Sequence, residues 1–166
     1  ACDTAAARLD NAARRLRRAG VSNVERHLLA PGDKWPKRHA EKFDRVLVDA
    51  PCTGTGTWRR NPDARQRLAE SDLDELVVRQ AAILDAAALL VRKRGRMVYA
   101  TCSLLTEENE SQVNDFLTRH PGFSLLPLVR AWPLEAPPPC AGDTLSLTPA
   151  SHGTDGFFAA VLERTA

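Results

Sequence analysis

Two cysteines stand at matching positions in this 166-residue chain, each shortly after a short apolar run. Cys52 follows residues 46–48 in the stretch FDRVLVDAPCTGTG, and Cys102 follows residues 97–100 in the stretch MVYATCS. A cysteine thiolate is a strong nucleophile and catalyses reactions by forming covalent intermediates. Asp49 places a carboxylate three residues before Cys52. These residue types point to covalent catalysis by a thiol beside an acid.

Methylation at C5 of a pyrimidine is one reaction that uses this set of groups. C5 is too weak a nucleophile to attack a methyl donor unaided, and a thiolate that adds to the neighbouring C6 turns the ring into an enamine. An acid near N3 would stabilise the addition product, and Asp49 is the candidate. A second thiol could help to expel the first after methyl transfer.

The competing interpretation is that both thiols are buried core residues, because free cysteine is among the most buried residue types. Their matching placement after two strand-like runs argues against it. Core burial is sufficient to explain Cys2 and Cys140. The chain has no C-x-x-C pair, so we expect no metal site.

The two cysteines need elements that bring them to one place. Short apolar runs bounded by turn residues indicate buried strands of a parallel sheet, and ligands bind beyond the carboxyl ends of such strands. Between the runs, residues 71–93 predict a long helix that Gly95 ends. Strand, helix and strand predict a right-handed parallel crossover, which brings both cysteines to one sheet edge.

The rest of the chain predicts one α/β domain over residues 1–166. A helix is expected over 107–119 and a strand over 123–129, and the proline-rich residues 131–149 are interpreted as a loop. Residues 157–162 predict a closing strand. Because no helix connects it to the preceding strand, this last pair should be antiparallel. The sheet is therefore expected to be mostly parallel with an antiparallel C-terminal strand.

The N-terminal residues 1–4 are interpreted as the end of a strand followed by a helix start. A strand that ends in an acid before a helix is the second half of a mononucleotide-binding unit, whose acid bonds a ribose hydroxyl. Asp3 is the candidate for this role, and a helix cap is the alternative. The Gly-rich turn that precedes such a unit is not within the 166 residues. We therefore expect the chain to be a fragment.

Two loops carry further candidate binding residues. Asp33 lies near the expected end of another strand and could contact an adenine amino group, although a turn residue after Pro31-Gly32 fits equally well. Trp58, Arg59 and Arg60 combine a stacking ring with cations, which suits single-stranded nucleic acid. Packing of the tryptophan against arginine is the structural alternative.

The composition is that of an ordinary globular chain, with 43% hydrophobic and 27% charged residues. A formal net charge of +2 gives no global argument for nucleic acid. No apolar run approaches the roughly 20 residues of a membrane span, and the first residues lack a signal-peptide pattern. We expect a cytoplasmic protein without a membrane partner.

Five motifs in a fixed order resemble the Nop/Sun-type (Sun/Fmu-like) RNA cytosine-C5 methyltransferases, which use S-adenosylmethionine. The motifs are DAPCTGTG (49–56), RRNPD (59–63), YATCS (99–103), EENE (107–110) and DGFF (155–158). The chain is similar to the C-terminal part of the catalytic domain of these enzymes. The resemblance implies a Rossmann-like methyltransferase fold that lacks its first strand and Gly-rich loop.

The resemblance also implies a role for each thiol. Cys102 would be the nucleophile, Cys52 would assist product release, and Asp49 would contact the target cytosine and the methyl-donor region. In DNA cytosine methyltransferases the Pro-Cys thiol is the nucleophile instead, and the TCS motif favours the RNA type.

The remaining candidate residues bind cofactor or RNA under the same resemblance. The S-adenosylmethionine site would include Asp3, Asp33, Asp49 and Pro51. The substrate RNA would contact Trp58, Arg59 and Arg60.

The expected activity is methylation of cytosine C5 in RNA, with ribosomal RNA as the expected substrate. The 166 residues alone are expected to bind the cofactor poorly and to be inactive, because half a site forfeits preorganisation. An open sheet edge would favour self-association. The alternatives are a non-catalytic RNA-binding remnant and a small-molecule methyltransferase with incidental cysteines.

Overall fold

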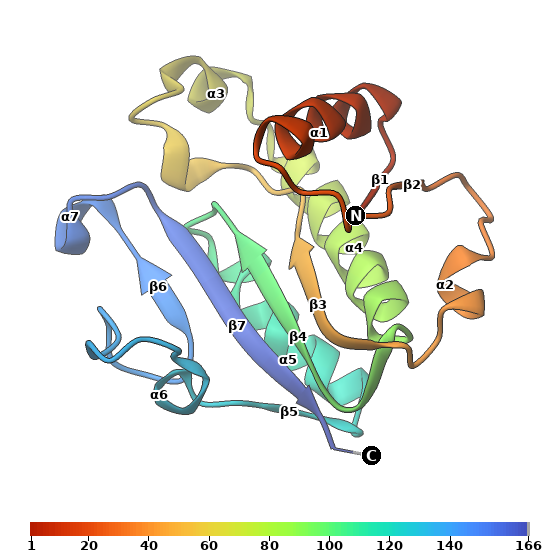
Figure 1. Cartoon of the computed structure of the whole chain (residues 1–166). Coiled ribbons are helices and arrows are strands. Elements are labelled where there is room, and N and C mark those ends of the chain that lie inside the picture. Colours follow the sequence, from red (N-terminus) through yellow and green to blue (C-terminus); the bar gives the residue numbers. More distant parts are fainter. Residues whose placement is uncertain (166) are drawn as a thin grey trace. The chain divides into compact units, whose positions relative to one another are not determined.

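The computed structural model describes residues 1–165, which form two compact units (Figure 1). The first unit is Ala1–Arg38 and the second begins at His39. Each unit has its own sheet. Among the described residues, no helix has the length and apolar character needed to cross a membrane.

The first unit combines a two-stranded parallel sheet with one long helix. Its elements are β1 (Cys2–Asp3), α1 (Ala6–Arg18), β2 (His27–Leu28) and α2 (Trp35–Arg38). Cys2 pairs with His27, and Asp3 pairs with Leu28. Leu9 is buried on the inner side of α1. The predicted strand end followed by a helix is confirmed at the start of the chain.

The second unit contains a larger mixed sheet, its helices and the two cysteine loops. Its elements are β3 (Phe43–Asp49), the 3₁₀ helix η1 (Thr55–Thr57), α3 (Pro62–Arg67), α4 (Glu70–Ala88), β4 (Val91–Thr101), the 3₁₀ helix η2 (Thr106–Glu108), α5 (Glu110–Arg119), β5 (Phe123–Leu125), α6 (Leu128–Ala131), β6 (Leu145–Leu147), α7 (Pro149–His152) and β7 (Phe157–Arg164).

The sheet of the second unit has the order β3-β4-β7-β5, and β6 also pairs with β7. β3 and β4 are parallel, whereas β7 runs antiparallel to β4, β5 and β6. Figure 1 shows the C-terminal strand β7 lying beside β4. The predicted mostly parallel sheet with an antiparallel C-terminal strand is confirmed.

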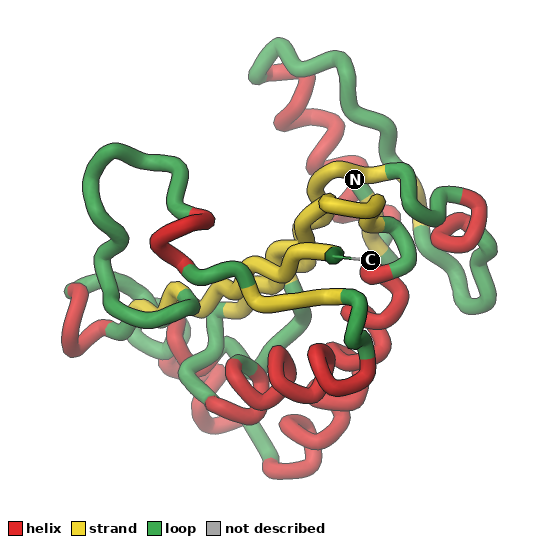
Figure 2. The backbone as a smooth tube through the Cα atoms, turned by 90° about the horizontal axis from the view of Figure 1, so that it is seen from below, coloured by secondary structure: helices red, strands yellow, loops and turns green. Residues whose placement is uncertain are grey.

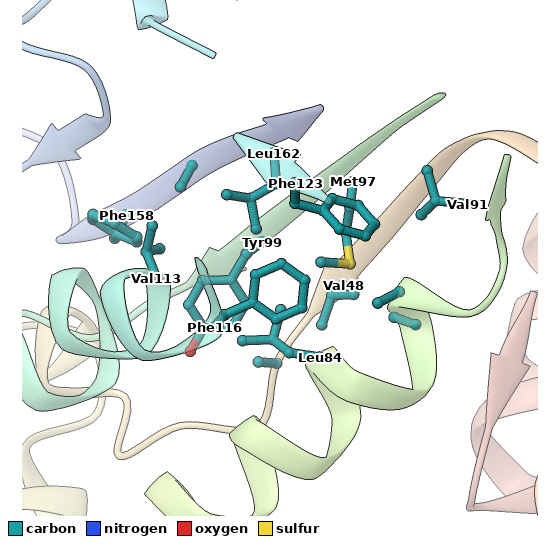
Figure 3. Close-up of a cluster of buried hydrophobic side chains, with 14 residues drawn as sticks. Val48, Leu84, Val91, Met97, Tyr99, Val113, Phe116, Phe123, Phe158 and Leu162 are labelled. Carbon is teal, nitrogen blue, oxygen red and sulfur yellow. The ribbon is translucent and has the colours of Figure 1, made fainter. Parts of the chain in front are cut away.

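Helices α4 and α5 cover one face of this sheet (Figure 2). Side chains alternate between the two faces of a strand, so Met97 and Tyr99 of β4 are fully buried while Val98 between them is only half-buried. They pack with Leu84 of α4 and Phe116 of α5 in the core cluster of Figure 3. Burial of each large side chain contributes about 1.5–3 kcal/mol, which fixes the helices against the sheet.

The predicted helix over residues 71–93 is wrong at its C-terminal end, because α4 ends at Ala88 and β4 begins at Val91. The carbonyls of Leu89 and Leu90 accept hydrogen bonds of 2.8 and 3.0 Å from the amides of Glu41 and Phe43. The chain therefore joins the sheet edge instead of continuing the helix. Gly95, expected to end the helix, lies within β4.

The predictions for the C-terminal third need two corrections. β5 is a strand only at Phe123–Leu125, because Pro127 precedes the short helix α6 and supplies no amide to a ladder. The segment 131–149 is not loop alone, since β6 (Leu145–Leu147) pairs with β7. A three-residue strand is too short for its alternation to be recognised among prolines. The helix expected at 107–119 begins as the 3₁₀ helix η2 and continues as α5.

Candidate active site

The two cysteine loops leave neighbouring parallel strands at the same edge of the sheet. Asp49, the last residue of β3, pairs with Ala100 near the end of β4. Beyond the strands, the Gly56 amide donates a 2.9 Å hydrogen bond to the Cys102 carbonyl. The Cys52 and Cys102 Sγ atoms lie 3.4 Å apart, in hydrogen-bond contact. The structure therefore brings together the two thiols that the sequence singled out.

The two thiols differ in acidity. A hydrogen bond from Cys52 stabilises the Cys102 thiolate and lowers the pKa of Cys102 to about 7. The pKa of Cys52 is raised, first by this same interaction with Cys102 and then by burial. Cys102 is therefore the thiol that ionises, and Cys52 the one that keeps its proton. Both side chains are partly accessible to solvent.

Hydroxyl groups also connect the two cysteine loops by hydrogen bonds. The Ser103 hydroxyl lies 3.3 Å from that of Thr53 and 3.2 Å from that of Thr55. The Leu104 amide donates a 2.8 Å hydrogen bond to the Thr55 hydroxyl. Ser103 and Thr55 are buried, so water does not compete for these bonds.

A buried carboxylate, Glu108, lies under the same two loops. It accepts hydrogen bonds from Thr53 and Gln80, and the Tyr99 hydroxyl donates a 2.6 Å bond to its backbone carbonyl. Glu108, Gln80 and Tyr99 have no exposed surface. Burial raises the pKa of Tyr99 above its ordinary value, so this phenol remains a hydrogen-bond donor.

Asp49 and Pro51 lie on the exposed side of the site. The charge of Asp49 opposes ionisation of Cys102 and so acts against the lowered pKa of that thiol. The Pro51 carbonyl accepts a 2.9 Å hydrogen bond from the Gln80 side chain. The backbone on the N-terminal side of Cys52 is thus anchored to α4.

The loop that carries Trp58, Arg59 and Arg60 is held by the DGFF motif. Arg60 forms an ion pair with Asp155, and the Arg59 guanidinium lies 3.8 Å from the same carboxylate. Both arginine side chains remain 62% exposed. The Arg65 guanidinium lies 5.8 Å from the centre of the Trp58 ring. The loop is ordered by contacts within the second unit and still presents cations to solvent.

Asp3 and Asp33 lie in the first unit. Asp3 accepts hydrogen bonds from the Ala5 amide and the Arg8 guanidinium, and the Arg8 bond lowers its pKa to about 2. Asp33 accepts from the His27 ring and the Trp35 amide, which lower its pKa. Both side chains are ionised at neutral pH and therefore act as acceptors.

Sequence reasoning missed Glu108 and Gln80 as parts of the site. Glu108 stands between other acidic residues, and nothing in the sequence distinguishes the one that turns inward. Gln80 had a signal, because it interrupts the apolar positions Leu76, Leu84 and Ala88 of one helical face. Within residues 1–165, no group of three or more histidine, cysteine or acidic side chains is placed to hold a metal ion.

Comparison with known proteins gives a consistent result. A family model described as 16S rRNA methyltransferase RsmB/F matches residues 1–163. The ribosomal RNA small subunit methyltransferase B of Pectobacterium carotovorum is 42% identical over 130 residues, which are 78% of this chain and 28% of that protein. A probable methyltransferase B from Synechocystis is 37% identical over 160 residues, 95% of this chain and 35% of that protein. The chain thus spans about a third of these relatives.

Solved structures of methyltransferases are also similar to this chain. The structure titled NSun6 from Pyrococcus horikoshii with SFG has a TM-score of 0.81 and 27% identity, and it covers 99% of this chain and 41% of its own. A methyltransferase homologue from the same organism has a TM-score of 0.75 at 28% identity, covering 98% of this chain and 52% of its own. These neighbours share the Rossmann-like methyltransferase fold. The chain belongs to the RsmB/F family of 16S rRNA methyltransferases.

Proposed function

We propose that this chain is part of an enzyme that methylates C5 of a cytosine in ribosomal RNA through a covalent adduct with Cys102. The observation that carries the proposal is the 3.4 Å contact between Cys52 and Cys102 at the ends of two parallel strands. The family match supports an RNA methyltransferase, and the thiol pair supports the pyrimidine C5 chemistry.

In this mechanism the Cys102 thiolate attacks C6, and the new S–C6 bond makes C5 nucleophilic. Asp49 orients the base by contact on its N3 side. After C5 has gained the methyl group, its proton passes to solvent water, the C5–H electron pair restores the C5–C6 double bond, and the C6–S bond breaks to return the Cys102 thiolate. Cys52 assists this release, because its Sγ contacts the departing Cys102 Sγ directly.

S-adenosylmethionine, when bound, supplies the methyl group. The acceptor character of the candidate residues fits this cofactor, because ribose hydroxyls and an adenine amino group need acceptors. Ionised Asp3 would bond the ribose, and ionised Asp33 the adenine. Asp49 and Pro51, in the second unit, are also proposed as cofactor contacts.

The 166 residues alone are expected to bind S-adenosylmethionine weakly and to turn over little, since they hold no Gly-rich cofactor turn. Micromolar binding of the cofactor to this chain in calorimetry would contradict that expectation. Self-association through the edge strand β3, which has β4 as its one strand partner within residues 1–165, stays a prediction. RNA is the proposed partner and the cytoplasm the proposed location.

The test of the covalent mechanism uses the full-length gene product with RNA that carries 5-fluorocytosine. Fluorine cannot leave C5 as a proton does, so the adduct persists and migrates as a protein–RNA complex under denaturing conditions. Cys102→Ala should abolish this complex. Cys52→Ala should let a covalent complex accumulate with unmodified RNA, because release is slowed.

Two results would overturn the assignment. Trapping that survives Cys102→Ala and is lost in Cys52→Ala would mean that the roles of the thiols are reversed. RNA binding without any trapping by the unsubstituted protein would favour a non-catalytic RNA-binding remnant.

A further inference from the structure

Glu108 is a fully buried carboxylate held by three donors. Its Oε1 accepts 2.9 Å hydrogen bonds from the Thr53 amide and from Gln80 Nε2, and its Oε2 accepts a 2.5 Å bond from the Thr53 hydroxyl. Two of the three donors belong to one residue, Thr53. Glu108 therefore fixes the backbone and the side chain of Thr53 together.

These bonds connect the two halves of the thiol pair. Thr53 directly follows Cys52, and Glu108 lies in η2, which follows the Cys102 loop. Gln80 binds both the Glu108 carboxylate and the Pro51 carbonyl, at 2.9 Å each. Cys52 is thus held on both sides, through Pro51 and through Thr53. The hydrogen bonds determine where the Cys52 loop stands relative to Cys102.

The charge of Glu108 does not activate the nucleophile. It opposes ionisation of Cys102 and so works against the thiolate. A buried carboxylate is also a poor source of net stability, because the cost of its desolvation offsets much of what its hydrogen bonds contribute. The role that remains for Glu108 is geometric. Its three charge-assisted hydrogen bonds have fixed directions and restrict the Cys52 loop more than apolar packing would.

We infer that Glu108 is a positioning residue that holds Cys52 against Cys102 through Thr53. The inference rests on the proposed function only for the chemical purpose of the thiol pair. The positioning itself concerns this chain alone and can be measured without methyl transfer.

The test measures the distance between the thiols by dibromobimane, which becomes fluorescent when it bridges two thiols. The chain carries Cys2→Ala and Cys140→Ala, so that Cys52 and Cys102 are its two remaining cysteines. Glu108→Ala removes all three hydrogen bonds and should slow bridging by about tenfold or more, since losing one bond to a charged group already corresponds to about tenfold. At a pH where Cys102 is fully ionised in every variant, Glu108→Gln should keep the rate, because its amide can accept from the Thr53 amide and donate to the Thr53 hydroxyl. The exposed neighbour Glu107→Ala is the matched control and should keep the rate.

A second readout separates positioning from support of the fold. Glu108→Gln removes the charge that opposes Cys102 ionisation, so the midpoint of the pH profile for Cys102 alkylation should move to lower pH. If Glu108→Ala does not fold, Thr53→Val serves instead, since it removes the hydroxyl and leaves the amide bond. It should slow bridging less than Glu108→Ala in a folded protein would.

The inference fails if folded Glu108→Ala or, in its place, Thr53→Val bridges as fast as the unsubstituted chain. It also fails if Glu107→Ala slows bridging equally. Slower bridging in the Glu108 or Thr53 variant with no RNA trapping by the full-length protein would refute the proposed function and leave the positioning role intact.

Discussion

The backbone of Gly156 packs directly on the backbone of Gly56. The Gly156 amide donates a 2.8 Å hydrogen bond to the Gly56 carbonyl, and a Cβ on Gly56 would stand 2.5 Å from the Gly156 carbonyl oxygen. Gly56 lies in the loop that carries Cys52, and Gly156 immediately precedes β7. Two motifs that are a hundred residues apart in the chain thus meet through glycine backbones.

Gly56→Ala should lower the free energy of unfolding by about 3 kcal/mol, because a backbone contact cannot yield to a methyl group as a flexible side chain would. Urea denaturation followed by circular dichroism measures the loss. Gly153→Ala is the control: unlike Gly56, Gly153 has a left-handed φ of +65°, but a Cβ there meets nothing within 4 Å. It should cost about 1 kcal/mol, the strain of that conformation alone. Equal losses in the two variants would contradict the packing argument.

The reactivity of Cys102 should follow its lowered pKa. In a chain with Cys2→Ala and Cys140→Ala, alkylation of Cys102 by iodoacetamide should rise with pH and reach half its maximum near pH 7. Adding Cys52→Ala removes the thiol donor that stabilises the thiolate, and burial then dominates, so the midpoint should move to higher pH. Mass spectrometry of the labelled peptide gives the rate at each pH. An unchanged midpoint would show that Cys52 does not activate Cys102.

Arg60 should contribute to RNA binding by contact with phosphate. In the full-length gene product, Arg60→Ala should weaken binding of a single-stranded RNA and reduce the slope of log affinity against log salt by about 1. Fluorescence anisotropy over a salt series measures both quantities. Arg92→Ala is the control, because Arg92 is also exposed and pairs with Asp44 near the start of β4, at the end of the strand away from the cysteines. A similar change in both variants would argue against a specific contact by Arg60.

Local sequence was enough to predict the strands that carry the two cysteines. The runs before Asp49 and Thr101 are short, apolar and bounded by turn residues, and the helix between them leaves few other connections. The end of that helix was not predictable, because Leu89 and Leu90 have good helix propensity. Their carbonyls accept hydrogen bonds from the amides of Glu41 and of Phe43, the first residue of β3, and these partners are distant in the sequence.

The buried half of the site was equally beyond local reasoning. The sequence shows which residues can ionise, but whether Glu107 or Glu108 turns inward depends on the position of the Cys52 loop. The interaction of Arg59 and Arg60 with Asp155 has the same origin, since it joins two loops that only the folded chain brings together. The roles of the site residues in catalysis stay predictions for the experiments above.

The position of β7 in the sheet has a consequence for folding during synthesis. Within residues 1–165, β7 is the last element, yet it lies between β4 and β5 and is the strand partner of β5 and β6. On a translating ribosome, the sheet of the second unit cannot close until Phe157–Arg164 has left the exit tunnel. Closure is then governed by long-range pairing, which is slow compared with local helix formation. Until that moment, the β4 edge that receives β7 is open to association with other chains.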